Sequence, residues 1–241
     1  MVLGEAFSTS DHQRLVRTLK TLAHHDTSGW ALTGGIATEL HIRRRGGDTI
    51  VRPLNDIDFL VRSFEDVPGS LGRDFLPRHV HTDDPPGKTL LQCVHPDTAI
   101  RVDVFRAYGS VMDRISTIDL PIGQVGMIAW PDLVARSARL NWDLAGNRPL
   151  APKYARDFLR LLEVAVPDEI EPVWREHRKT GSPQSFAETA RELRRLIESR
   201  ADLLIPPVYS TDVNEVCSRC RDTAELRLTE PAKILSLLGY C

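Results

Sequence analysis

The sequence predicts an α/β (α+β) protein: a mixed β-sheet with flanking helices over residues 1–120, followed by a helical half over residues 121–241. Two observations support this division. Short apolar runs separated by turn residues concentrate in the first half and are typical of strands. Beyond Pro121, apolar residues recur at helical spacing and charged residues cover the opposite faces. A chain of 241 residues is long enough to bury two modest cores.

The first half alternates between helical and extended patterns. Leucines at helical spacing follow Ser10 or Asp11, either of which can cap the first helix. A second helix ends at Gly46-Gly47, and turns containing Pro and Gly or Asp separate the later extended segments. The expected elements are a helix at 11–25, a strand at 30–33, a helix at 36–45, a strand at 50–62, and extended segments at 79–81, 89–95 and 99–105.

The second half is helical by periodicity. Its two linkers are expected at 146–149 and 180–183, where Gly, Pro and small polar residues gather. The expected helices lie at 132–144, 154–164, 169–178, 185–204 and 232–238.

Composition excludes several classes of protein. The net charge is −2, with 41% hydrophobic and 27% charged residues, so a strongly basic nucleic-acid binder is not indicated. The N-terminus shows no signal-peptide pattern and no apolar run approaches the ~18 residues of a membrane span, so we expect a cytoplasmic protein. In a reducing compartment the four cysteines are expected to be free thiols. A zinc site is not indicated, because no second Cys or His pair accompanies Cys217/Cys220.

Asp56 and Asp58 stand two residues apart in an apolar run. Successive side chains of a strand point to opposite faces, so both carboxylates project to one side while Ile57, Phe59 and Val61 pack on the other. Carboxylates this close repel each other unless a cation lies between them. Hard oxygen ligands suit Mg²⁺ or Mn²⁺, which also hold phosphates. The pair therefore predicts a divalent metal site.

A third carboxylate, Asp103, lies between Val102 and Val104 in an apolar strand, where it is costly without a partner. It could complete the metal site, or it could form a structural ion pair with Arg101 or Arg106. The residues alone leave both readings open.

A glycine pair and a lysine flank the carboxylates in the sequence. Gly34-Gly35 separates a strand from a helix, where backbone N–H groups can approach phosphate oxygens because no Cβ intervenes. Lys153 stands at the head of a later helix that also carries Asp157. The alternative structural roles are a simple turn at the start of a helix for the glycines and a solvent-exposed position for Lys153.

Taken in order, the Gly-Gly turn, the Asp-Ile-Asp stretch and the later strand aspartate resemble the nucleotidyltransferase fold of the DNA polymerase β superfamily. The chain is most similar to its AbiEii-type group, which includes toxins of abortive-infection and toxin–antitoxin pairs. Arg52 and Asp56-Ile57-Asp58 match the group's Arg-x-Ser/Thr-x-Asp-apolar-Asp stretch, except that position 54 is Leu. The resemblance covers roughly residues 28–160.

The resemblance implies a nucleotidyltransferase-like sheet and a set of site residues. Asp56, Asp58 and Asp103 would hold Mg²⁺ or Mn²⁺, and Asp103 would also assist deprotonation of the attacking hydroxyl. Lys153 completes the implied catalytic set. The residues implied to bind the nucleotide are Thr33, Gly34, Gly35, Arg52, Lys153 and Asp157.

The leading hypothesis is a Mg²⁺-dependent nucleotidyltransferase that moves a nucleoside monophosphate from an NTP to a hydroxyl. The acceptor would be an RNA 3′ end, a protein or a small molecule, and the group resemblance adds a toxin or phage-defence role with a cognate antitoxin as a partner. One alternative is a catalytically silent nucleotide-binding regulatory module. Another is a glycosyltransferase that holds Mn²⁺ and a nucleotide sugar through Asp-x-Asp, although only about 55 residues precede the motif.

Overall fold

The computed structural model describes residues 6–83, 87–120 and 122–205. Its helices are α1 Thr9–Leu22, α2 Gly34–Arg44, α3 Trp130–Asn141, α4 Pro152–Val164, α5 Pro167–His177, α6 Phe186–Glu198 and α7 Ala201–Leu204. Its strands are β1 Ala31–Thr33, β2 Asp56–Val61, β3 Leu76–Asp83, β4 Gly87–Val94, β5 Arg101–Arg106, β6 Ser116–Leu120 and β7 Gly123–Met127. Short 3₁₀ turns follow several of these elements, at Phe64–Asp66 (η2), Gly69–Arg73 (η3), Val111–Asp113 (η4) and Trp142–Leu144 (η5).

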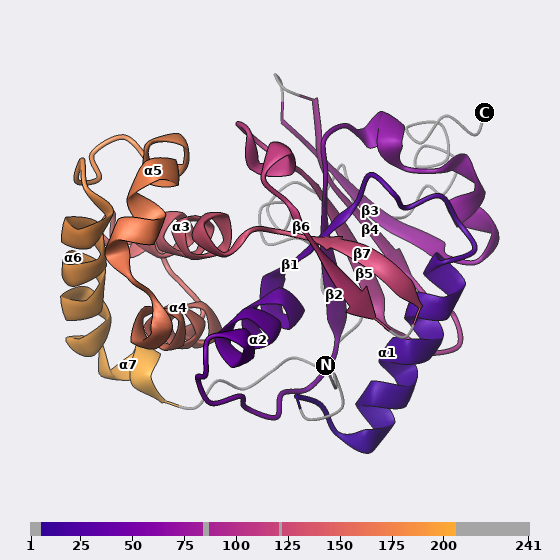
Figure 1. Cartoon of the computed structure of the whole chain (residues 1–241), viewed down its shortest axis with the longest axis horizontal. Helices are drawn as coiled ribbons and strands as arrows, with labels where there is room; N and C mark the ends of the chain where they lie inside the picture. The colour runs from indigo at the N-terminus through magenta and orange to yellow at the C-terminus, as the bar shows by residue number, and fades with distance from the viewer. Residues whose placement is uncertain (1–5, 84–86, 121, 206–241) are drawn as a thin grey trace.

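The strands form one mixed seven-stranded sheet in the order β3-β4-β5-β2-β1-β7-β6. Parallel pairing joins β2 to β5 and β1 to β7, and every other neighbouring pair is antiparallel. The helical portion, α3 to α7, lies on one side of the molecule, and α2 lies between it and the sheet (Figure 1). The predicted architecture of a mixed sheet followed by a helical portion is confirmed.

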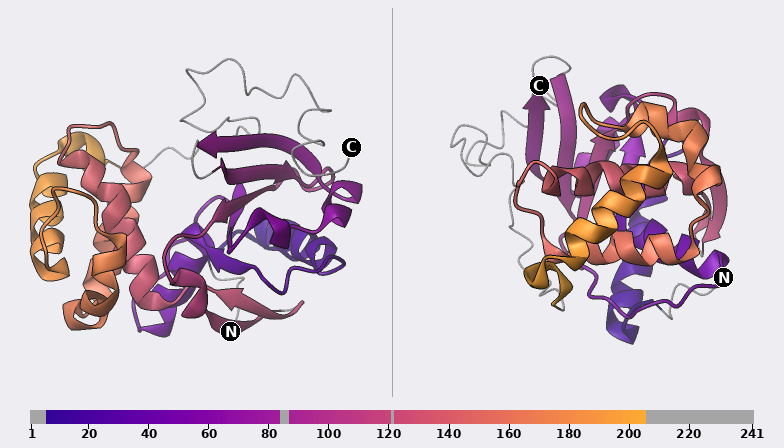
Figure 2. Two further views of the ribbon diagram at one scale, coloured as in Figure 1. Left: turned by 90° about the horizontal axis from the view of Figure 1, so that it is seen from above. Right: turned by 90° about the vertical axis from the view of Figure 1, so that its left-hand side faces the viewer.

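The two faces of the sheet have different roles. Leu15 and Leu19 of α1 meet Leu32 and Phe59 on one face, as part of a continuous apolar core. The opposite face carries the side chains of the alternate positions, among them Asp58, because neighbours along a strand point to opposite sides. Burying one face under helices therefore leaves the other for polar side chains. Figure 2 shows the helical portion beside the sheet from two further directions.

Local sequence explains where the helices begin. The hydroxyl of Ser8 accepts a hydrogen bond from the Asp11 N–H at 3.1 Å, so Ser8 caps α1, not Ser10 or Asp11 as expected. Asp11 instead lies in the first turn and pairs with Arg14 at 2.7 Å. Helices α3, α4 and α5 each have a proline in the first turn, where a missing N–H costs nothing.

The last strand of the sheet, β7, ends at Met127. The domain boundary expected at residue 120 stays a prediction. None of the helices in the described part of the chain is both long and apolar enough to span a membrane. The helix expected at 232–238 and the Cys217/Cys220 pair lie outside the described residues.

A buried polar network joins the loop after β5 to the helical portion. Asp132 of α3 and His177 of α5 have fully buried side chains, and the His177 Nε2 lies 2.8 Å from the Asp132 carboxylate. Since a carboxylate only accepts, Nε2 carries the proton, and the neutral ring accepts at Nδ1 from the Tyr108 hydroxyl at 2.7 Å. Arg114 donates to both oxygens of Asp132. The network fixes the helices against the sheet.

His177 makes stability depend on pH. Burial lowers the pKa of His177, so the folded state binds this proton less readily than the unfolded state. The stabilisation is present above the unfolded pKa near ~6.5 and is lost as pH falls below it. Relative to His177→Gln, the wild type should lose about 1 kcal/mol of unfolding free energy between pH 7.5 and 5.5.

Urea unfolding at both pH values measures this difference. The comparison with the variant cancels the contributions of carboxylates that both proteins share. The exposed His24→Gln should follow the wild-type pH dependence, and identical slopes in wild type and His177→Gln would contradict the assignment.

Candidate active site

Three carboxylates converge at the middle of the sheet. Asp56 and Asp58 come from β2, Asp103 comes from the neighbouring parallel strand β5, and Asp58 lies directly opposite Asp103. One carboxylate oxygen from each residue lies within 4.8 Å of the others. We call these three residues the Asp triad. Alternation along the strand explains why Asp56 and Asp58 share a face, as the sequence predicted.

Two members of the triad, Asp58 and Asp103, belong to a polar row that crosses the sheet. Each member is the direct cross-strand neighbour of the next, so all the side chains stand on one face. From β3 to β1 the row reads His79, Gln92, Asp103, Asp58 and Thr33.

The Asp103 side chain is buried, and the three carboxylates repel one another. Burial raises the pKa of Asp58 well above its usual value, and the charges of Asp56 and Asp103 raise it further. Burial also raises the pKa of Asp103 to about 6, against the opposing effect of Arg101. A cluster with these properties favours a cation among its oxygens.

Asp103 has two partners in the described structure. Arg101 donates from Nε to its Oδ1 at 2.8 Å, and Gln92 Nε2 lies 3.2 and 3.1 Å from its two oxygens. Arg101 also donates from Nη2 to Asp56 Oδ2 at 2.7 Å. The ion pair with Arg101 that the sequence left open is therefore present, together with the triad. Gln92 was not predicted as a site residue. An amide inside the apolar run Leu90–Val94 could have indicated it, because a buried polar group needs a hydrogen-bond partner.

The glycine turn lies against the triad. Gly34 begins α2 with φ +63°, and a Cβ added there would fall 1.8 Å from Asp58 Oδ2. The hydroxyl of Thr33, just before it, is buried and has no hydrogen-bond partner within residues 6–83, 87–120 and 122–205. The turn thus brings the N-terminus of an 11-residue helix, which favours negative charge, next to the carboxylates.

Gly34→Ala should disturb the site as well as the backbone. The added Cβ must displace the Asp58 carboxylate, and a non-glycine residue at this φ costs on the order of 1 kcal/mol or more. Gly46→Ala is the matched control, because Gly46 has φ +78° and no atom within 4 Å of an added Cβ. Thermal unfolding should show a loss in both variants, whereas Mn²⁺ binding should fall in Gly34→Ala alone. Equal Mn²⁺ binding in the two variants would contradict the contact.

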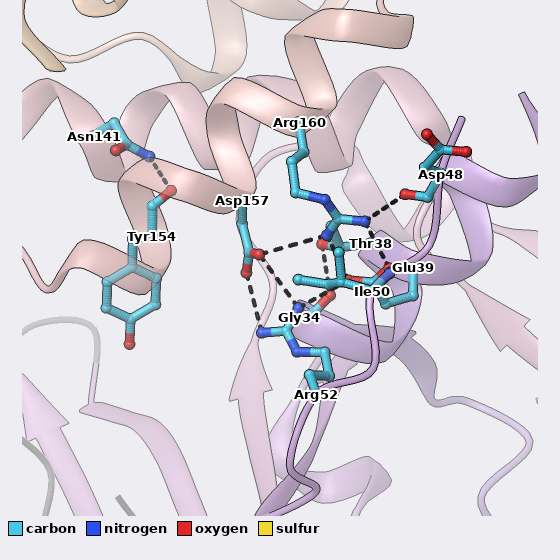
Figure 3. Close-up of polar contacts among 10 residues, drawn as sticks. All are labelled: Gly34, Thr38, Glu39, Asp48, Ile50, Arg52, Asn141, Tyr154, Asp157 and Arg160. Carbon is cyan, nitrogen blue, oxygen red and sulfur yellow. Dashed lines mark hydrogen bonds and ion pairs between the residues drawn. The ribbon is translucent and has the colours of Figure 1, made fainter. Parts of the chain in front are cut away.

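Helix α4 brings a lysine and a tyrosine towards the triad. The Lys153 ammonium acts on Asp58 to lower its pKa, against the larger effect of burial. Lys153 Nζ lies 4.9 Å from the centre of the Tyr154 ring. Burial raises the pKa of Tyr154, and the charges of Asp58 and Asp56 add to this rise. Figure 3 shows the Tyr154 ring pointing from α4 towards the sheet. Tyr154 was not among the predicted site residues.

Arg52 and Asp157 lie together behind the glycine turn. The Arg52 guanidinium reaches the two oxygens of Asp157 at 3.3 and 3.2 Å and Glu39 Oε1 at 3.3 Å (Figure 3). A Cβ on Gly35 would lie 3.1 Å from the same guanidinium. Arg160 donates to both oxygens of Glu39 at 2.6 and 2.9 Å. We call Glu39, Arg52, Asp157 and Arg160 the α2–α4 ion cluster.

The structure therefore brings the predicted residues into two neighbouring groups. Asp56, Asp58 and Asp103 form the triad, with Thr33 and Gly34 beside Asp58. Arg52 and Asp157 belong to the α2–α4 ion cluster, which joins the glycine-turn helix to the helix that carries Lys153. Glu39 and Arg160 were not predicted, because their partners come from distant segments.

No protein-family model matches the chain, and no curated protein sequence matches it. Its structure is similar to that of an antigenic nucleotidyltransferase-like protein from Paracoccidioides brasiliensis, with 17% identity, a TM-score of 0.43 and coverage of 79% of this chain and 90% of that one. It is also similar to the lincosamide antibiotic adenylyltransferase LnuA, with 13% identity, a TM-score of 0.39 and coverage of 64% and 97%. It is also similar to the Megavirus polyadenylate synthase, with 12% identity, a TM-score of 0.41 and coverage of 73% of this chain and 35% of that one. At these identities and TM-scores the similarity assigns no activity to this chain.

Proposed function

We propose that the protein is a Mg²⁺-dependent nucleotidyltransferase of the DNA polymerase β superfamily, which transfers a nucleoside monophosphate from an NTP to a hydroxyl. The observation that carries the proposal is the convergence of three carboxylates from two parallel strands, with the start of α2 directly beside them. A cation-holding cluster beside the N-terminus of a helix is a combination that suits the binding of phosphates.

The donor set of the triad fits a divalent metal ion. It consists of three carboxylates whose oxygens lie close enough to share one ion, and Mg²⁺ and Mn²⁺ prefer such oxygens. Asp56, Asp58 and Asp103 would hold the ion. When bound, it would neutralise charge on the phosphates and lower the pKa of the attacking hydroxyl.

The other side chains bind and orient the substrate. Backbone N–H groups at Gly34 and Gly35 and the buried Thr33 hydroxyl would donate to phosphate oxygens. Lys153 would approach the triphosphate from α4 as a point charge. Arg52 is held by Glu39 and Asp157. Its positive charge next to the glycine turn would attract the phosphates, and Asp157 would orient its guanidinium.

The reaction is an in-line displacement at the α-phosphorus. The acceptor oxygen forms a bond to the α-phosphorus. The bond between the α-phosphorus and the oxygen that links it to the β-phosphorus breaks, and pyrophosphate leaves. The proton of the acceptor hydroxyl would pass to a carboxylate oxygen of Asp103. Without a bound ion, burial raises the pKa of Asp103 to about 6.

The acceptor is an RNA 3′ end, a protein side chain or a small molecule. The net charge of −2 disfavours a long RNA interface, because broad phosphate contacts require an excess of basic residues. The AbiEii resemblance adds a toxin or defence role with a cognate antitoxin. A test that follows the label to its acceptor separates these cases.

A second candidate is a nucleotide-binding regulatory module without catalysis. The observation that favours it is Arg101, which already neutralises two of the three carboxylates through its ion pairs. A module of this kind would bind an NTP and release it unchanged.

The purified protein should be incubated with each α-³²P-labelled NTP, Mg²⁺ and either total RNA or a cell lysate. Transfer of label in the wild type and not in Asp56→Ala/Asp58→Ala would support the enzyme and identify the acceptor class. NTP binding without transfer would favour the regulatory module. Absence of both transfer and NTP binding would refute the proposal.

A further inference from the structure

Arg101 lies on the triad-bearing face of the sheet. It stands opposite Asp56 on the neighbouring strand and two residues before Asp103 on its own strand, so the three side chains share that face. Its guanidinium spans Asp56 and Asp103 with hydrogen bonds of 2.7 and 2.8 Å. The positive charge that the repelling carboxylates require is thus supplied by the chain itself.

Arg101 uses oxygen lone pairs that a metal ion would also need. Asp103 Oδ1 accepts from Arg101 and from Gln92, and Oδ2 accepts from Gln92 as well. A carboxylate offers about four lone-pair sites, of which Asp103 therefore has three engaged. A divalent ion and the guanidinium also repel each other at such short range. Binding of the ion and the Arg101 contacts therefore compete.

Displaced from the carboxylates, the guanidinium needs another anion. The Arg101 side chain is only 13% exposed, and an arginine left in a largely buried position without a partner is costly. Free Mg²⁺ supplies no such partner. A triphosphate supplies several anionic oxygens in a geometry that suits the planar fork of an arginine.

We propose that Arg101 makes the triad select a metal–triphosphate complex over the free metal ion. Arg101 competes with the ion for Asp56 and Asp103, and the triphosphate that arrives with the ion takes over the guanidinium. This inference rests on the proposed function, since it assumes that the triad holds a divalent ion. It makes Arg101 a substrate-binding residue that couples nucleotide binding to metal binding.

The consequence is a measurable coupling between two ligands. Wild-type protein should bind Mn²⁺ weakly on its own and much more tightly as a complex with an NTP analogue. Removing the guanidinium should strengthen binding of Mn²⁺ alone by about tenfold, and the coupling between metal and nucleotide should shrink correspondingly.

Binding of Mn²⁺ alone is followed through the electron paramagnetic resonance signal of the free ion. Calorimetric titration then measures binding of the Mn²⁺ complexes of the four α,β-methylene nucleoside triphosphates, which cannot react. The variants are Arg101→Gln, which removes the charge, and Arg101→Lys, which keeps the charge without the fork. Arg106→Gln is the control, because Arg106 lies on the same strand as Arg101 but on the opposite face of the sheet.

Tighter Mn²⁺ binding in Arg101→Gln than in wild type and in the control supports the inference. Equal or weaker binding overturns it while leaving the triad as a metal site. If neither wild type nor Arg101→Gln binds Mn²⁺, alone or with any analogue, the proposed function fails too. If the variants do not fold, the NMR signal of the Arg101 Nε–H group in ¹⁵N-labelled wild type provides the test. A shift of this signal on adding Mg²⁺ and the NTP analogue together supports the inference, and an unchanged signal overturns it.

Discussion

Asp58→Asn is expected to slow nucleotidyl transfer severely and to raise the stability of the protein. Burial and the charges of Asp56 and Asp103 raise the pKa of Asp58, so its ionised form disfavours the folded state. An amide of the same shape removes this repulsion. In EDTA at pH 7.5 the free energy of unfolding should therefore be higher for the variant than for the wild type.

The same substitution removes a ligand from the centre of the triad. Loss of the charge stabilisation that a metal site supplies should lower the transfer rate by about 10³-fold or more. Mn²⁺ at a concentration well above its dissociation constant should stabilise the wild type and leave the variant unchanged, so the order of stabilities reverses with metal. Opposite effects on stability and activity are typical of functional sites that hold repelling groups.

Urea unfolding with EDTA or Mn²⁺, together with the rate of label transfer, measures these effects. Asp119→Asn is the control, because Asp119 is an exposed carboxylate on β6 and should change neither quantity appreciably. If Asp58→Asn lost stability in EDTA, Asp58 would be a structural residue whose charge the fold requires.

The Asp56/Asp58 pair could be predicted from the sequence because its geometry is local. Asp56 and Asp58 share a face through the two-residue period of a strand, and Asp103 is conspicuous between two valines. The glycine turn was predicted from the close approach that a missing Cβ allows, and the structure adds the contact of Gly34 with Asp58. Each of these inferences depends on a few neighbouring residues.

The partners of these residues could not be predicted, because they depend on tertiary contacts. Arg101 contacts Asp56 only because β2 and β5 are parallel neighbours in one register, which no short motif reveals. Arg52 was expected at the triphosphate on the strength of a motif. In the structure its fork is bound by Glu39 and by Asp157, a residue of α4 about one hundred positions further along the chain.

The α2–α4 ion cluster shows why such contacts matter for function. Glu39 is 1% exposed and accepts from Arg52, Arg160 and the backbone N–H of Ile50. Arg160 and Asp157 belong to α4, the helix that begins beside Lys153. One buried carboxylate thus fixes the helix after the glycine turn to the helix that presents the lysine.

Glu39→Gln should therefore destabilise the protein by about 3 kcal/mol, because Arg52 and Arg160 lose the buried carboxylate that they share. Glu198→Gln, at the exposed end of α6, should cost less than about 0.5 kcal/mol. Urea unfolding at pH 7.5 gives both values. Transfer by the folded fraction of Glu39→Gln should also fall, because α4 no longer holds Lys153 at a fixed distance from the triad. Full activity in that fraction would show that the cluster serves stability alone, and a loss below about 1 kcal/mol would show that Asp157 and water satisfy both arginines.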